Sequence, residues 1–179
     1  ENSVAAYVSE DRKVFTLTYD RFTLSSKGAS DPAILVSQSA VCNLKLRIGI
    51  DDGWVVALPS LQVDGYVNLD SGAQASQRVY YSFNGEHMPM LWIDFSGPMA
   101  SNYSEKSHIT PERLAWSPCS ANRSIQLDLT AFGLLTTRGS AMGLLTADTS
   151  DGYFKQSFST EWKPCGASPK ILASTLTVY

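Results

Sequence analysis

The side chains that could carry acid–base or metal chemistry are few and far apart. His87 and His108 are the only histidines, and neither has a second ligand at the spacing of a zinc motif. The sequence contains no Gly-x-Ser-x-Gly elbow and no glycine-rich phosphate loop. We therefore interpret both histidines as exposed loop residues and predict no metal site and no cofactor.

Aspartates are the remaining candidates for catalysis. A glycosidase-type acid pair or a calcium site would draw on Asp51, Asp52, Asp64, Asp70, Asp94, Asp148 and Asp151. The stretch Asp148–Gly152 resembles a cation loop only weakly, because it lacks the regular ligand spacing of an EF-hand. Aspartates clustered in this way more commonly stabilise turns. We therefore expect a protein that is not an enzyme.

Aromatic and methionine side chains offer a binding site instead. A sugar-binding face could use Trp54, Trp92, Trp116, Trp162, Tyr66, Tyr80, Tyr81 and Tyr103, with core packing as the alternative. Trp54 is expected to be the best exposed, because it directly follows a turn-forming Asp-Asp-Gly sequence. His87, Met88 and Met90 form a candidate protein-contact surface, since methionine side chains adapt to irregular partners.

The elements that must position these residues are strands, because apolar and polar residues alternate with a period of two along the chain. Strands are predicted at Val14–Tyr19, Asn43–Ile50, Leu61–Leu69, Arg78–Phe83, Met90–Phe95, Ser124–Ala131, Ser140–Thr146, Tyr153–Trp162 and Ile171–Tyr179. Asn84-Gly85 predicts a tight hairpin after the fourth of them. Leu24–Ser39 is interpreted as a sizeable loop.

About nine strands without helical periodicity predict an all-β fold, an antiparallel β-sandwich. The 179 residues suit a single domain over 1–179, with 166–179 able to add a C-terminal strand. The net charge of −3, with lysines and arginines scattered singly, argues against nucleic acid or an anionic membrane as a partner. No apolar run is long enough to span a bilayer, and we expect that any signal peptide has been removed.

Three cysteines, Cys42, Cys119 and Cys165, leave one without a partner if two of them pair. In a secreted protein this implies a fourth cysteine upstream of residue 1, whereas three unrelated buried thiols would suit the cytosol. Two N-glycosylation sequons, at Asn102 and Asn122, favour the secreted interpretation. We therefore expect an extracellular, disulfide-bonded glycoprotein.

Short motifs around the cysteines follow a recognisable pattern. They are Cys42–Leu46, Gly65–Gly72, Phe95–Pro98, Leu114–Cys119, Leu127–Leu129, Thr146–Gly152 and Glu161–Cys165. This pattern resembles the secreted proteins of the domain-of-unknown-function 4360 family, common in filamentous fungi. The resemblance implies that Cys119 pairs with Cys165 and that Cys42 pairs with a cysteine upstream of residue 1. It supplies no catalytic residue.

These features predict a small extracellular binding protein. The first hypothesis is a fungal effector, relevant to virulence, that binds a host extracellular protein and acts as a protease inhibitor in the apoplast. Its contact loop would be Leu24–Ser39 or the Asn84–Met90 hairpin. The alternative is a lectin-like protein that binds wall or surface glycans through Trp54 and nearby tyrosines. An acid-pair hydrolase is the third hypothesis.

Overall fold

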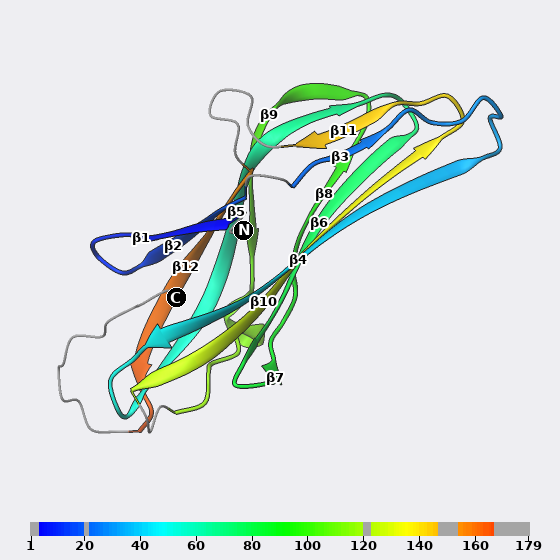
Figure 1. The fold of residues 1–179 in the computed structure, drawn as a ribbon. Helices are drawn as coiled ribbons and strands as arrows, with labels where there is room; N and C mark the ends of the chain where they lie inside the picture. The colour runs from blue at the N-terminus through cyan, green and yellow to red at the C-terminus, as the bar shows by residue number, and fades with distance from the viewer. Residues whose placement is uncertain (1–3, 20–21, 120–122, 147–153, 167–179) are drawn as a thin grey trace.

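The computed structural model describes residues 4–19, 22–119, 123–146 and 154–166, which form two antiparallel sheets (Figure 1). The seven-stranded sheet has the order β1 (Val4–Val8), β2 (Val14–Tyr19), β12 (Phe154–Pro164), β5 (Trp54–Leu69), β11 (Gly143–Thr146) and β3 (Leu24–Ser26), and β9 (Met99–His108) also pairs with β5. The five-stranded sheet has the order β4 (Leu35–Gly49), β10 (Ser124–Arg138), β6 (Ala73–Phe83) and β7 (Glu86–His87), and β8 (Leu91–Ser96) also pairs with β6. A short 3-10 turn, η1, spans Pro111–Arg113. The all-β, antiparallel prediction is therefore confirmed.

The described residues contain twelve strands, more than the nine or so predicted for the whole chain, and the predicted C-terminal strand Ile171–Tyr179 lies outside the described residues. The strands not predicted are β1, β3, β7 and β9, which are short or mainly polar. Seven of the ten residues of β9 are exposed, so this strand shows almost no apolar alternation. Its conformation follows from backbone pairing with β5, and propensity alone does not reveal such strands.

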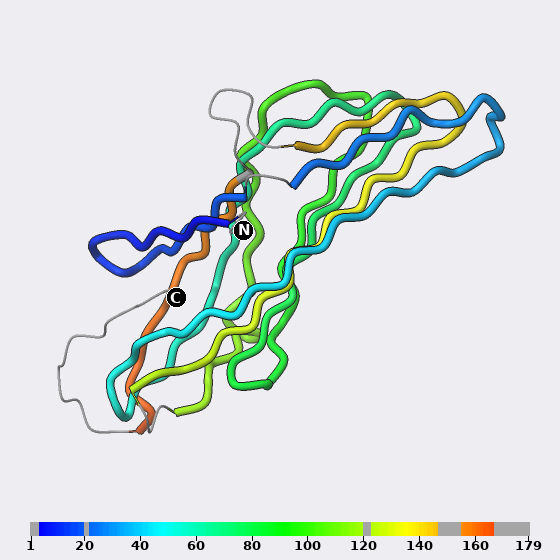
Figure 2. The backbone as a smooth tube through the Cα atoms, viewed as in Figure 1, coloured from blue at the N-terminus to red at the C-terminus, as the bar shows by residue number. Residues whose placement is uncertain are grey.

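The loop predicted at Leu24–Ser39 is shorter than expected, because strands occupy both of its ends. Leu24–Ser26 is β3, and β4 already begins at Leu35. Near its start β4 contains the polar residues Ser37, Gln38 and Ser39, but the strand pairs with the end of β10 in an unbroken register from Leu35–Arg138 onward. The two strands run side by side along their whole length (Figure 2). The predicted loop is therefore reduced to residues 27–34.

The core lies between the two sheets, where the alternating residues of each strand meet. Phe15, Leu17 and Tyr19 of β2 are buried, as the alternation predicted. On β4, Leu46 and Ile48 are buried while Lys45 and Arg47 are exposed.

None of the described residues forms a helix that is long and apolar enough to cross a membrane.

A polar contact also joins the sheets through the core. Gln77 of β6 donates a hydrogen bond from Nε2 to the hydroxyl oxygen of Tyr103 in β9, at 2.8 Å. Both residues are buried, and the Tyr103 ring packs on Phe95 of β8. Burial raises the pKa of the Tyr103 hydroxyl, so it stays protonated. Tyr103 can approach β5 this closely because Gly65 has no side chain.

Gly65→Ala is therefore expected to lower the free energy of unfolding by about 1–3 kcal/mol. A Cβ at this position would lie 2.6 Å from the Tyr103 hydroxyl oxygen and 2.9 Å from the Thr146 carbonyl oxygen. Urea denaturation followed by tryptophan fluorescence would measure the change. Gly166→Ala is the control, because no atom lies within 4 Å of the added Cβ. Equal stability of the two variants would contradict the tight packing described here.

Candidate functional site

The predicted hairpin forms at Asn84-Gly85, between β6 and β7. Both residues have positive φ angles, 49° and 88°, as a two-residue hairpin turn requires. His87 is exposed next to this turn. Met88 and Met90 are half-buried, and Met88 packs against the core, so less methionine surface is available than the protein-contact hypothesis assumed.

Trp54 is not the exposed platform that the sequence suggested. It is half-buried and packs against the core. The turn before it is tied to the end of β12, because the Cys165 N–H donates to the Gly53 carbonyl oxygen at 2.7 Å. Trp54 therefore offers only part of its ring to a ligand.

The aspartates do not gather into one site. Asp52 lies 3.6 Å from the Arg123 guanidinium, Asp64 accepts a hydrogen bond from Ser104, and Asp70 accepts one from the Met142 N–H. Asp148 and Asp151 lie outside the described residues. Within the described residues, no cluster of three or more His, Cys, Asp or Glu side chains could hold a metal ion.

Cys119 and Cys165 form a disulfide with a Cα–Cα distance of 5.7 Å. This confirms the pairing that the family resemblance implied. Cys42 is a free, half-buried thiol on the inward face of β4, and burial raises its pKa. Of the two sequons, Asn102 is exposed on β9, whereas Asn122 lies outside the described residues. Glycosylation of these asparagines and an upstream disulfide partner for Cys42 remain predictions.

A groove of about 410 Å³ lies on the outward side of the five-stranded sheet, where strands β10, β6 and β8 run next to one another. Its lining residues are Gln74, Ala75, Ser76, Arg78, Asp94, Phe95, Ser96, Leu134 and Thr136. Large aromatic side chains stand beside it on the same side. Trp92 is 41% exposed and Tyr80 is 47% exposed. We call this groove and its aromatic neighbours the outer face.

The strand register fixes the arrangement of the outer face. Arg78 is the Cα partner of Phe132 on one side and of Trp92 on the other, so aromatic residues flank it in both directions. Tyr80 follows two residues later on the same side of β6. The Arg78 guanidinium lies 3.5 Å from an Asp94 carboxylate oxygen, in an exposed ion pair. One cation and one anion leave the groove without net charge.

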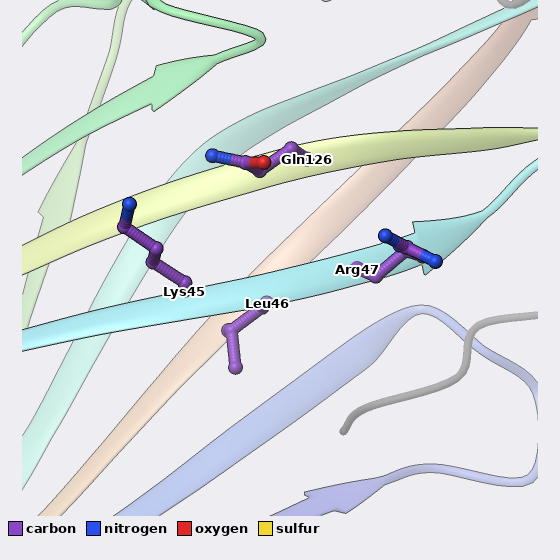
Figure 3. A pocket seen from close by; sticks show the side chains of 4 residues that line it. All are labelled: Lys45, Leu46, Arg47 and Gln126. Carbon is purple, nitrogen blue, oxygen red and sulfur yellow. The ribbon is translucent and has the colours of Figure 1, made fainter.

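A second hollow, of about 300 Å³, lies near the end of β4. Lys45, Leu46 and Arg47 line it together with Gln126 of β10 (Figure 3). Lys45 and Arg47 are exposed, and Leu46 points to the opposite side of the strand (Figure 3). This hollow has two cations but no aromatic side chain. It therefore lacks the mixture of stacking and hydrogen-bonding groups that the outer face provides.

The outer face was not identified from the sequence, although part of its signal was present. In β8, Leu91, Ile93 and Phe95 alternate with Trp92, and a tryptophan on the polar side of an alternating strand is expected to be exposed. Tyr80 and Tyr81 are adjacent, so only one of them can point into the core. Their proximity across β6 and β8 depends on register, which the sequence does not reveal.

The sequence pattern of the domain of unknown function DUF4360 matches residues 1–165, a region that contains all twelve described strands and both disulfide cysteines. A protein from Arthroderma benhamiae, described as an uncharacterized secreted protein, is 26% identical over 167 residues. The alignment covers 92% of this chain and 66% of the relative, so the chain spans slightly less than two thirds of that protein. The family match confirms the resemblance seen in the cysteine motifs.

Proposed function

This chain belongs to the DUF4360 family, and we propose that it is a secreted, non-enzymatic protein that binds a neutral glycan through the outer face. The secreted relative supports export, as does the Cys119–Cys165 disulfide, because such bonds persist in oxidising compartments. The observation that carries the proposal is the pair of exposed aromatic residues, Trp92 and Tyr80, beside a polar groove.

The chemistry of the outer face suits a sugar chain. Sugar rings have apolar C–H surfaces that stack on aromatic rings, and hydroxyl groups that need hydrogen-bond partners. The outer face supplies both. The Arg78–Asp94 pair lies next to Trp92 in the strand register, and the amide and hydroxyl groups of Gln74, Ser96 and Thr136 lie farther along the same groove. Because the groove has no net charge, a neutral glycan suits it better than an acidic one.

A hydrolytic role is less well supported. Hydrolysis of a glycosidic bond usually requires two carboxyl groups on either side of the bond. Among the described residues that line the groove, Asp94 is the only acid, and it is paired with Arg78. The proposal is therefore binding without catalysis.

Trp92→Ala is expected to weaken glycan binding at least tenfold, because an exposed aromatic residue at a sugar site contributes much of the contact energy. Pull-down on chitin, cellulose and insoluble β-1,3-glucan would measure this, with Tyr80→Ala as a second variant. Tyr7→Ala is the matched control, since Tyr7 is 64% exposed but lies on β1 in the other sheet. If the native chain binds none of these polysaccharides, or if Trp92→Ala binds as the native chain does, the proposal is wrong.

A protein partner held by the hairpin is the second candidate. It is favoured by the exposed positions from Asn84 to His87, at the turn between the paired strands β6 and β7. In this case Trp92→Ala would bind the partner normally, whereas His87→Ala would bind it less well. An effector or protease-inhibitor role would require this second surface.

A further inference from the structure

The longest strand edge that lies free in the described structure belongs to β4. This strand has 15 residues, Leu35–Gly49, and stands at the end of the five-stranded sheet. It pairs with β10 on one side, and no described strand pairs with its other side. About half of its backbone N–H and C=O groups therefore point away from the sheet over roughly 50 Å.

Proteins usually protect such edges with charges, prolines, glycines or bulges. The ten residues from Leu35 to Leu44 contain no charged residue, no proline and no glycine. Leu35 and Val41 are 56% and 57% exposed on the outward side. The inward side is only half covered at Ala40, Cys42 and Leu44, which pack against the rim of the core. The edge is therefore open both to backbone pairing and to apolar contact.

We infer that β4 pairs with β4 of a second copy of this chain, antiparallel and centred on Cys42. Residue 42 is the midpoint of Leu35–Gly49, so this register uses the full length of both strands. Residues whose numbers sum to 84 then face each other. On the inward side, Ala40 meets Leu44, and Val36 meets Ile48. The half-exposed rim of each core is covered by the other copy.

The charges fit the same register. Lys45 meets Ser39 of the other copy, and Arg47 meets Ser37, so no like charges face each other. Both basic side chains are exposed near the end of the strand, on the side opposite to Leu46 (Figure 3). An interface of 15 residues a side is smaller than the 20–30 of a standard complex, so the dimer is expected to be weak. The second copy is preferred to an unrelated peptide because this strand complements itself.

Charge substitutions at Ser39 test the inference, because this exposed residue faces Lys45 of the other copy twice in the symmetric dimer. Sedimentation of the 179-residue chain at rising concentration should show the average mass increase from 19.5 kDa toward twice that value. Ser39→Lys should weaken the dimer about two- to thirtyfold, and Ser39→Glu should strengthen it. A monomer at every concentration would overturn the inference. Equal effects of Lys and Glu would overturn it as well.

Cys42, which is a free thiol in the 179-residue chain, reports the register independently. Opposed residues of antiparallel strands have Cα atoms about 4.5–5.5 Å apart, within the range of a disulfide. Added oxidised glutathione, which is reduced as the two thiols join, should therefore give a covalent dimer of the native chain. Cys42→Ser should lose this cross-link but keep the concentration-dependent increase in mass. A dimer that does not cross-link would contradict the register centred on Cys42.

Discussion

Replacing Cys119 and Cys165 together by serine is expected to lower the free energy of unfolding by about 4 kcal/mol. The two cysteines are 46 residues apart, and closing a loop of this length in the unfolded chain has an entropic effect of that size. The loss is large compared with the total stability of an ordinary domain, about 5–15 kcal/mol. We therefore expect the double variant to be only marginally folded at 37 °C.

Other contacts near the disulfide should keep the segment before Cys119 in place when the bond is removed. Ser117 bonds to β5 through its N–H and its side-chain oxygen, at 2.8 and 3.0 Å from Val56 backbone atoms. The Lys163 ammonium lies 3.9 Å from the centre of the Trp116 ring. These contacts should hold the segment before Cys119 on the sheet even without the bond.

Equilibrium unfolding in urea, compared between the native chain and the double variant, measures the effect. Cys42→Ser is the control, since Cys42 forms no bond with either cysteine. A loss below about 1 kcal/mol would mean that the unfolded chain is already compact or that the bond strains the folded state.

Phe158→Ala is expected to cost about 3–5 kcal/mol, the second large effect. The ring of Phe158 in β12 stacks on that of Phe15 in β2, with centroids 4.6 Å apart and planes inclined by 11°. The two residues lie opposite each other in the register of β12 and β2, and both are buried. Removing one ring leaves a cavity in the core beside the neighbouring strands β2 and β12.

Thermal and urea unfolding would measure this cost. Tyr80→Ala is the control, because it also removes a large aromatic ring but from an exposed position, where substitutions change stability little. Similar losses in both variants would contradict the placement of Phe158 in the core and of Tyr80 on the surface.

The fold could be predicted from the sequence because period-two alternation acts locally. In β2 and in the second half of β4, the residue types alone distinguish the inward from the outward side. The first half of β4 mixes apolar and polar residues on both sides, and most of β9 is polar, so their conformation depends on pairing with β10 and β5. The residue types within these segments do not indicate which strands they pair with.

The candidate site could not be predicted in the same way. Arg78, Trp92 and Phe132 come from three strands and meet only through the register of the five-stranded sheet. Trp54 seemed more exposed because its turn chemistry was visible in the sequence, whereas the packing of its ring against the core was not. The disulfide pairing was predicted only through the family resemblance, since three cysteines allow three pairings.

Glycan binding by the outer face can be tested in one titration, because the chain contains four tryptophans. The indole N–H groups of Trp54, Trp92, Trp116 and Trp162 should give separate signals in a proton–nitrogen NMR spectrum. Adding soluble oligosaccharides of the polysaccharide bound in the pull-down should shift the Trp92 signal and leave the other three in place. If Trp54 moves while Trp92 does not, or if no signal moves at saturating sugar, the outer face is not the binding surface.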